Sequence, residues 1–406
     1  MIQVLLLEHD DVRYLYPFSI THCAWELRVG RFTNLDRWTN AMVDATVTVA
    51  SNRDQHVRSF VERNPGAAAP FRPLPTLMIG GHIVLSPDTM RTLESACMRA
   101  DAAILLFVDE VPVGAFLPDA PDSPAHAQAM LDALDAATCT SVDISGFAVT
   151  RLWQTFEFIT QGAVWDSDVP TEGDDAVVHM SVAIDEEDGP VLIEGGAVIE
   201  PHVYLKGPVV IGRNSLIKSG SRISNSLIGP SCKVSGDLDT VILQGNTSKQ
   251  HEGFLGNSYL GEWINLGAGT TTSNLKNTYG NVSVDLPWGS EDTGLMFLGL
   301  LMGDHTKTAI GTRFSTGSIC GVGCNIVSDT LAPRAIGSFS WIVAGETVAL
   351  TEIEKMLAVA RIAMSRRSQT LQPHDEALLR TIHDAAAAPR TIHDAAAAGE
   401  QAGSTS

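Results

Sequence analysis

An aliphatic side chain recurs at every sixth residue in the second half of the chain, and this period constrains the fold more than any other feature. The run comprises Ile193, Ile199, Leu205, Ile211, Ile217 and Ile223. Four places after each of the first five lies a small or branched residue: Ala197, Val203, Val209, Ser215 and Ser221. Neither the turn of an α-helix nor the alternation of a flat strand gives this spacing. A period of six predicts a parallel β-helix, in which each flat side points one aliphatic inward and stacked coils pair their strands.

The repeat is interrupted and then returns. The phase slips at Ile228, and hexads come back in two later blocks, Leu255–Gly267 and Ile310–Gly323. A glycine follows the aliphatic residue in both blocks, as expected where a corner needs a backbone conformation that other residues avoid. Hexads are absent between about 272 and 305, which predicts a loop that leaves the coil there.

Two cysteines in the last block invite a metal-binding interpretation. With Ile310, Thr316 and Val322 taken as the aliphatic positions, Cys320 lies at an inward place and Cys324 at an outward one. Side chains that point to opposite faces cannot share an ion, so we expect these thiols to diverge. The sequence therefore predicts no zinc site here, and no resident metal elsewhere in the β-helix.

Composition excludes several classes of function. The chain has 406 residues and a formal net charge of −20, with its basic residues scattered, so an acidic surface would repel a phosphate backbone. The longest apolar run, Leu295–Met302, is far shorter than a membrane span. The first residues lack the pattern of a signal peptide, and six widely spaced cysteines make no disulfide framework. We expect a cytoplasmic protein with no nucleic-acid or membrane partner.

The first 180 residues have the mixed pattern of an α/β domain. Strand-like runs at Val4–Leu7 and Ala102–Val108 alternate with a helix-like stretch at Ser86–Arg99, where Ser86 caps the start and proline follows. The domain organisation predicted from these textures is an α/β domain at 1–180, a β-helix at 190–345, a C-terminal helix at 346–370 and a disordered Ala-rich tail at 371–406.

The densest polar stretch of the chain runs from Asn246 to Tyr279. Within it, His251–Gly269 reads HEGFLGNSYLGEWINLGAG. This segment resembles the acetyltransferase half of the bacterial bifunctional glucosamine-1-phosphate acetyltransferase/N-acetylglucosamine-1-phosphate uridyltransferase family. It is similar above all to a divergent bacterial branch, which also shares the motifs at Met302–Lys307 and Ser338–Trp341. The resemblance covers roughly Ile193 to Arg367, with a weaker match near the N-terminus.

The resemblance implies an architecture and an activity. A nucleotidyltransferase-like α/β domain would precede a left-handed β-helix that assembles as a homotrimer, with acetyl-CoA lying between neighbouring coils. The handedness rests on the family alone. The implied reaction is direct N-acyl transfer from acetyl-CoA, or another acyl-CoA, to an amino-sugar phosphate such as glucosamine-1-phosphate.

The resemblance also assigns roles to residues of the polar stretch. His251 matches the general base, and an imidazole near neutral pH can take the proton of an attacking amine. The oxyanion that forms needs backbone N–H donors, and Gly267–Gly269 are the candidates, with Ala268 matching an acyl-CoA contact. Phe254 replaces the tyrosine of better-known members, which places one substrate hydrogen bond in doubt. Four further side chains are candidates for the sugar phosphate: Asn265 and Asn274, which match family asparagines, and Lys249 and Lys276, whose charge suits a phosphate.

The N-terminal half departs from ordinary nucleotidyltransferases. Its first strand runs into Glu8–Pro17 without the glycine-rich loop whose amides would cradle a triphosphate. The divergent branch shares this departure, and Pro17–Gly30 resembles its opening. Arg13 and Arg28 are the candidates to hold the phosphates of UTP or another nucleotide, with Mg²⁺ required if this half is active. An active domain and a degenerate scaffold remain equally open.

Three alternatives follow from these ambiguities. In the first, the N-terminal half is inactive and the protein acylates a different amino sugar or small amine. In the second, both halves bind sugar nucleotide without catalysis and regulate a partner. The third is another enzyme. A metal-dependent hydratase of the carbonic-anhydrase type would need three histidines at a subunit interface. The better-matched stretch offers only His251 and His305.

Overall fold

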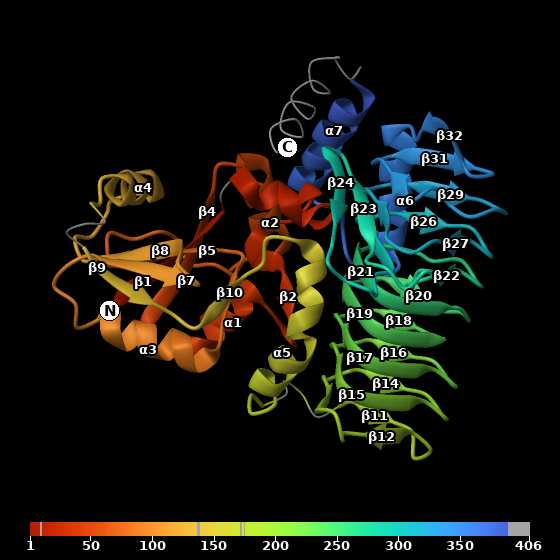
Figure 1. The fold of residues 1–406 in the computed structure, drawn as a ribbon, viewed down its shortest axis with the longest axis horizontal. Helices are drawn as coiled ribbons and strands as arrows, with labels where there is room; N and C mark the ends of the chain where they lie inside the picture. Colours follow the sequence, from red (N-terminus) through yellow and green to blue (C-terminus); the bar gives the residue numbers. More distant parts are fainter. Residues whose placement is uncertain (9, 136–138, 171–172, 174, 389–406) are drawn as a thin grey trace. The chain divides into compact units, whose positions relative to one another are not determined.

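The computed structural model describes residues 1–8, 10–135, 139–170, 173 and 175–388. The chain divides into two compact units: Met1–Leu15 with His22–Pro170, and Tyr16–Thr21 with the described residues after 170. The first is an α/β domain and the second a parallel β-helix followed by helices, as the sequence predicts (Figure 1).

A six-stranded mixed sheet forms the centre of the first unit, in the order β4-β1-β5-β8-β7-β9. β1 is parallel to β4 and β5, whereas β8 is antiparallel to β5 and β7. The strands of this unit are β1 (Ile2–Glu8), β2 (Arg28–Val29), β3 (Phe32–Thr33), β4 (Ala45–Ser51), β5 (Thr76–Gly80), β6 (Ile83–Leu85), β7 (Ile104–Val108), β8 (Val111–Leu117), β9 (Thr140–Asp143) and β10 (Gly146–Ala148). Its helices are α1 (Asn34–Ala41), α2 (Asp54–Arg63), α3 (Pro87–Cys97), α4 (Pro124–Asp132) and α5 (Ile159–Asp166), with 3₁₀ helices η1 (Asp10–Leu15), η3 (Ala24–Glu26) and η4 (Leu152–Phe158).

β1 is buried on both faces, which explains its continuous apolar run. Val4 and Leu6 pack in one core with Trp38 of α1 and Met90 of α3. Leu5 and Leu7 belong to a second core with residues of β5, β8 and α4. Helices therefore cover both faces of the sheet.

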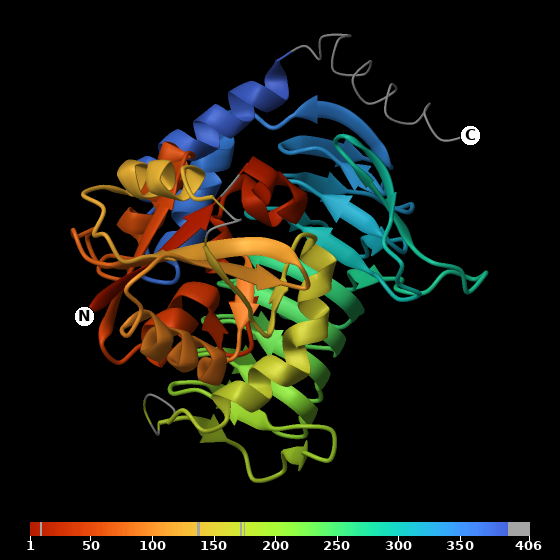
Figure 2. The same ribbon diagram turned by 60° about the vertical axis from the view of Figure 1, so that its left-hand side comes forward.

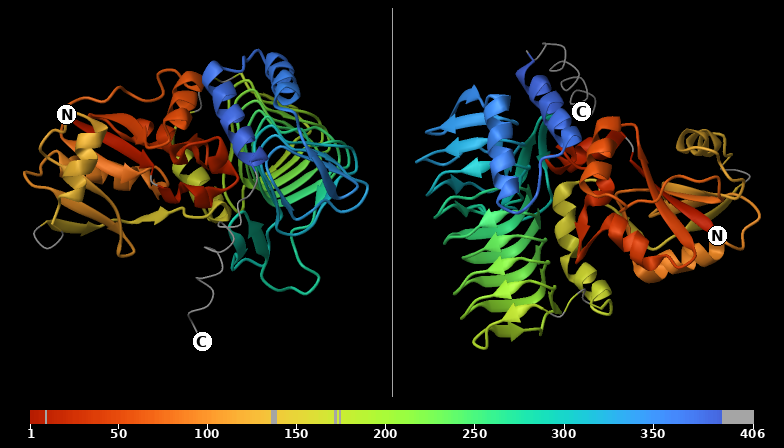
Figure 3. Two further views of the ribbon diagram at one scale, coloured as in Figure 1. Left: turned by 90° about the horizontal axis from the view of Figure 1, so that it is seen from above. Right: turned by 180° about the vertical axis from the view of Figure 1, so that it is seen from behind.

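The second unit contains the 3₁₀ helix η2 (Phe18–Ile20), the β-helix, α6 (Ile353–Ser365) and α7 (Pro373–Ala387). Its strands are β11 (Val177–Val178), β12 (Ala183–Asp185), β13 (Val191–Ile193), β14 (Val198–Ile199), β15 (Tyr204–Ile211), β16 (Leu216–Ile217), β17 (Arg222–Ile228), β18 (Lys233–Val234), β19 (Asp237–Gly245), β20 (Ser248–Lys249), β21 (Phe254–Glu262), β22 (Thr271–Thr272), β23 (Ser283–Leu286), β24 (Gly289–Asp292), β25 (Leu300–Met302), β26 (Lys307–Thr308), β27 (Arg313–Phe314), β28 (Ser318–Cys320), β29 (Asn325–Val327), β30 (Ala335–Ile336), β31 (Ser340–Val343) and β32 (Glu346–Leu350). Figure 3 shows the coils stacked side on and nearly end on.

The first run of hexads points inward along the stack. The aliphatics of this run are each at most 1% exposed from Ile199 to Ile223. The small or branched residues between them are equally buried: Ala197, Val203, Val209, Ser215 and Ser221. The pairing begins earlier than the predicted start at 190, because β11 already pairs in parallel with β14.

The phase assigned to the last block is wrong. Ile310 is 77% exposed, whereas Phe314, Cys320 and Ile326 fill the core. Gly311 has φ near +71°, a conformation typical of a tight corner. The corner at Gly311 precedes the inward residue Phe314, whereas the prediction placed Gly311 directly after an inward Ile310. Cys324 is also fully buried in this core and its thiol hydrogen-bonds that of Cys320. The two thiols therefore meet inside the coil, in contrast to the predicted divergence.

The predicted loop leaves the coil after β22 and returns at β25 (Figure 2). Its ends are tied by a bridge between Leu275 and Phe297, and its middle is the antiparallel hairpin of β23 and β24. The hairpin packs against the later coils, since β23 contacts β28 and β30 and Arg334 donates to the carbonyl of Ser283.

The C-terminal region has two helices, not one helix and a tail. α6 lies within the predicted helical stretch, but α7 occupies residues for which disorder was predicted. A proline at its first turn and the burial of Leu378 and Leu379 account for α7. The predicted disorder of 389–406 lies outside the described residues. No helix within the described ranges is both long and apolar enough to cross a bilayer.

Candidate functional site

One flat side of the β-helix carries Asn265 and is called here the Asn265 side. It consists of β11, β14, β16, β18 and β20, then Asn265, then β26, β29 and β31. Asn265 lies between Ser248 and Lys307 in this ladder, with an exposed side chain. Alternation along each strand sends one residue outward and the next into the core.

His251 lies at the corner that follows β20, and its side chain is exposed. The next coil stacks directly on this corner, because the N–H of Gly269 donates to the carbonyl of Glu252 over 3.1 Å. The coil beyond continues the column, since Gly311 donates to the carbonyl of Ala268 over 2.7 Å. Within the described ranges neither ring nitrogen of His251 has a hydrogen-bond partner, so the imidazole is available to a substrate.

Backbone donors near His251 differ in availability. The N–H of Gly267 donates to Thr308 Oγ1 over 3.0 Å, and the N–H of Gly269 is used by Glu252. The N–H of Ala268 has no partner among the described residues. Of the three backbone groups suggested for the oxyanion, Ala268 alone is thus available in this state.

Lys249 occupies an inward position of the Asn265 side, in register with Ile217 and Val234. Its side chain is only 2% exposed. Nζ donates to the carbonyl of Ser235 over 3.0 Å and to that of His251. Burial lowers the pKa of Lys249 to about 8, against the opposing effect of Glu252. The ammonium thus fixes the backbone beneath the His251 corner and faces two carbonyls, not solvent.

The other two candidates for the sugar phosphate lie at a different corner. Asn274 follows β22, on the far side of that strand from His251, and its amide donates to Asn257 Oδ1 over 2.7 Å. Lys276 lies in the loop and donates to the carbonyl of Asn281. Within a single copy of the protein, His251, Ala268 and Asn265 thus lie near one corner. Asn274 and Lys276 lie at another.

The nucleotide-binding candidates of the first unit lie on separate elements. Arg13 is in η1 and donates to the Tyr14 hydroxyl over 3.0 Å, while Arg28 is in β2 and donates to the carbonyl of Arg31 over 2.7 Å. A cavity lined by Glu8, His82 and other residues has a volume of about 20 Å³. That volume suits about one water molecule and is far too small for a nucleotide.

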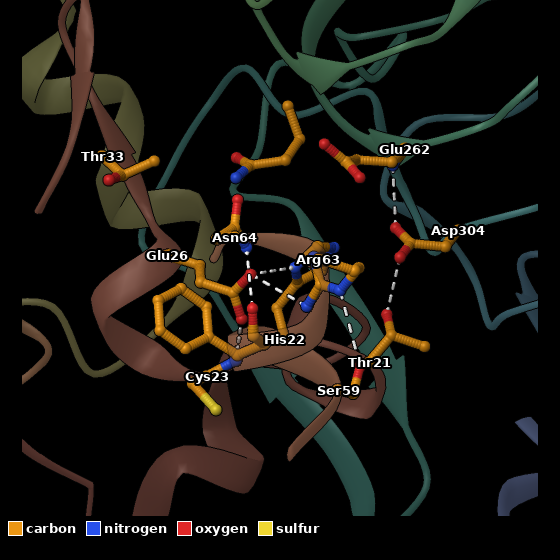
Figure 4. Close-up of polar contacts among 12 residues, drawn as sticks. Thr21, His22, Cys23, Glu26, Thr33, Ser59, Arg63, Asn64, Glu262 and Asp304 are labelled. Atoms are coloured by element: carbon orange, nitrogen blue, oxygen red, sulfur yellow. Dashed lines mark hydrogen bonds and ion pairs between the residues drawn. The ribbon is translucent and has the colours of Figure 1, made fainter. Parts of the chain in front are cut away.

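Closed ion-pair networks fill the carboxyl end of β1 and its surroundings. Glu8 accepts from Arg53 Nε over 2.6 Å, from Ser51 over 2.7 Å and from the N–H of Ala24 over 2.7 Å. Nearby, burial raises the pKa of Glu26, but Arg63 at 2.9 Å and His22 more than offset this and hold it at about 2 (Figure 4).

The carboxylates of this region do not fit a Mg²⁺ site as they stand. The oxygens of Glu8 already accept several hydrogen bonds, and Mg²⁺ needs carboxylate oxygens that are free to coordinate it. Across the described chain, no group of three or more His, Cys, Asp or Glu side chains is placed to hold a metal ion.

Two motifs that are distant in sequence meet in the second unit. Thr21 donates to Asp304 Oδ2 over 2.8 Å, and Asp304 Oδ1 accepts from the N–H of Glu262 over 2.8 Å (Figure 4). Phe18 also packs edge-on against Tyr259, with ring centroids 5.9 Å apart. The segment at Pro17–Thr21, read from the sequence as part of a nucleotide domain, therefore belongs structurally to the β-helix unit.

Comparison with known proteins gives partial matches, and no protein-family model matches the chain. Bifunctional protein GlmU of Cyanothece sp. is 28% identical over 217 residues, which are 45% of this chain and 40% of that protein. A bifunctional sugar-1-phosphate nucleotidylyltransferase/acetyltransferase of Sulfurisphaera tokodaii is 30% identical over 161 residues, 34% of this chain and 40% of the relative. The chain thus spans well under half the length of these relatives.

Among solved structures, UDP-N-acetylglucosamine acyltransferase from Campylobacter jejuni matches 56% of this chain and 89% of its own. The sequence identity is 14% and the TM-score 0.22, a likeness too low to support an inference. Part of the chain is thus similar in sequence to bifunctional sugar-1-phosphate nucleotidyltransferase/acetyltransferase proteins.

Proposed function

We propose that the β-helix unit is an acyl-CoA-dependent N-acyltransferase acting on an amino-sugar 1-phosphate such as glucosamine-1-phosphate. The observation that carries the proposal is the His251 corner. It presents an exposed imidazole without a protein partner, next to a coil whose Ala268 N–H is also unpaired within the described ranges. A base and an oxyanion donor on adjoining coils are what acyl transfer to an amine requires.

The chemistry follows from these two groups. His251 accepts a proton from the neutral amine while the nitrogen lone pair forms a bond to the thioester carbonyl carbon. The carbonyl oxygen becomes an oxyanion that the N–H of Ala268 stabilises. When the tetrahedral intermediate collapses, the C–S bond breaks and the thiolate leaves, taking the proton from the imidazolium. The products are the amide and free CoA, and no acyl-enzyme forms.

A trimer is part of the proposal. Ile310 continues the column of the His251 corner, and Val327 and Val343 lie one place before that column in later coils; the three are 77%, 47% and 40% exposed. Apolar side chains gathered along one edge of a stack mark an interaction surface. A second copy against this edge would cover them and bring another corner, such as that of Asn274 and Lys276, toward His251. Those two residues remain candidates for the sugar phosphate in that assembly, whereas the buried ammonium of Lys249 supports the backbone of the His251 corner.

The test is an acetyl-transfer assay with acetyl-CoA and glucosamine-1-phosphate on purified full-length protein. His251→Ala is expected to lower kcat by about 10²- to 10⁴-fold, the usual loss of a general base. His179→Ala is the matched control, because that histidine is also exposed on the β-helix unit but lies in its first coil. Its kcat should equal that of the wild type.

Two outcomes would contradict the proposal. Release of free CoA thiol at the wild-type rate in His251→Ala would exclude the histidine as the base. Binding of sugar nucleotide with no turnover of acetyl-CoA by the wild type, with any amino-sugar phosphate, would favour the alternative of a non-catalytic assembly protein.

A further inference from the structure

A cavity lies between the Asn265 side and the C-terminal end of α6, within the second unit, where α6 runs beside β26 and β29 (Figure 1). Its volume is about 130 Å³. Outward residues of stacked strands form one wall, among them Lys233, Asn265 and Lys307. Arg366 and Arg367, directly after α6, form the other.

The cavity is strongly cationic in an acidic chain. Four of its lining residues carry positive charge (Lys233, Lys307, Arg366 and Arg367) and none is Asp or Glu. The formal net charge of the whole chain is −20. Four cations that converge on one cavity repel each other, and an anion between them would remove that repulsion.

Neighbouring basic residues are treated differently by the fold. Arg361 of α6 pairs with Glu376, and Arg380 of α7 pairs with Glu354 and Glu376. No carboxylate pairs with any of the four cavity cations in the described ranges. The fold therefore neutralises the basic residues around this cavity and leaves those that line it without a counter-charge.

Two of the cations are held in place. Arg367 donates to Ser248 Oγ over 2.8 Å and to the carbonyl of Ser231, and Lys307 Nζ donates to the carbonyl of His305 over 2.9 Å. An arginine has five N–H donors and a lysine three, so both keep donors for a ligand. Burial lowers the pKa of Lys307 to about 8, which an anion close by would counteract.

Size and chemistry narrow the class of ligand. A volume of about 130 Å³ is enough for one or two phosphoryl groups. Guanidinium forks and ammonium groups are the usual partners of phosphate oxygens. The amides of Asn265 and Gln250 add neutral donors.

We propose that this cavity is a phosphate subsite, formed by Lys233, Lys307, Arg366 and Arg367, for a phosphomonoester or diphosphate group of one of the two substrates. The subsite itself stands on the cavity and its charges. Its assignment to a substrate rests on the proposed acyl transfer, because both acetyl-CoA and an amino-sugar phosphate carry such groups. Asn265, at the same cavity and beside the His251 corner, connects the subsite to the reacting atoms.

Calorimetric titration of the full-length protein with inorganic pyrophosphate tests the subsite. Lys233→Ala/Arg366→Ala removes two cations that make no hydrogen bond to the protein in the described ranges, so the fold should survive. We expect Kd for pyrophosphate to rise at least tenfold. Arg361→Ala, the matched control, removes one positive charge from the same helix outside the cavity, and its Kd should stay within twofold of the wild type.

Steady-state kinetics identify which substrate places its phosphate in the cavity. If KM of the double variant rises for acetyl-CoA and not for 3′-dephospho-CoA, the group is the 3′-phosphate of the donor. A rise for both donors indicates the diphosphate, and a rise for glucosamine-1-phosphate alone indicates the acceptor.

The subsite and the acyl transfer can fail separately. Wild-type pyrophosphate affinity in the double variant overturns the subsite, whatever the activity. Loss of pyrophosphate binding in the double variant, with His251→Ala binding as the wild type, supports the subsite even if no acetyl transfer is found with any amine.

Discussion

Lys249 illustrates how the place of a residue within a coil decides its chemistry. In sequence it is one lysine of a polar stretch, and a phosphate role follows naturally from its charge. In the fold its position in the repeat is inward, where the neighbouring coils have isoleucine or valine. Its ammonium is therefore satisfied by the carbonyls of Ser235 and His251. Charge can be read from a sequence, but the direction of a side chain can be read only where the repeat is regular.

The buried ammonium of Lys249 predicts a pH dependence of stability. Its pKa is about 8 in the folded chain against 10.5 for an ordinary lysine. Between these values the unfolded chain binds more protons, so this residue makes folding more favourable as pH rises. In urea unfolding, the free energy of the wild type relative to Lys249→Met should rise by about 2 kcal/mol from pH 8 to 9.5. A difference independent of pH would show that the ammonium reaches solvent.

At the scale of elements, regularity determined what could be predicted. The first hexads and the segment that leaves the coil could be predicted from the sequence. An unbroken series of aliphatic residues allows only one assignment of inward and outward positions. In the last block, both Ile310-Gly311 and the later Phe314 and Cys320 satisfy a spacing of six, and only the backbone shows which set faces inward. The cavity cations could not be grouped from the sequence, because Lys233 and Lys307 precede Arg366 by 133 and 59 residues. α7 was missed because alanine-rich composition says little about packing.

The packing of α6 against the β-helix is expected to depend on its buried apolar side chains. Leu357 is fully buried in a cluster with Trp263, Val322 and Phe339. Leu357→Ala should lower the free energy of unfolding by about 2–5 kcal/mol, because a cavity replaces a buried side chain. Val359→Ala on the same helix, where the side chain is 44% exposed, should change it by less than about 0.5 kcal/mol. Equal effects of the two substitutions in urea unfolding would mean that α6 does not pack as described.

For the whole molecule, the question is whether the first unit catalyses nucleotidyl transfer in addition to the acyl transfer proposed for the second. Ligands of parallel sheets bind at the carboxyl ends of the strands. In the first unit that end of β1 is occupied by Glu8, Ser51 and Arg53, bonded to each other. The adjoining cavity has about 20 Å³, and Arg13 and Arg28 are bonded locally. These bonded side chains occupy the end of the sheet at which a triphosphate would be expected to bind.

We therefore expect acetyl transfer without nucleotidyl transfer. The full-length protein, incubated with N-acetylglucosamine-1-phosphate, Mg²⁺ and each of ATP, CTP, GTP, UTP and dTTP, should release no pyrophosphate above a protein-free control, while the same preparation acetylates glucosamine-1-phosphate. The control is Arg72→Ala, at an exposed arginine of the same unit that precedes β5. Pyrophosphate release that Arg13→Ala or Arg28→Ala abolishes, and that Arg72→Ala leaves intact, would contradict the expectation and show that the closed network opens when a nucleotide binds. If the expected result holds, the first unit has a role other than that reaction.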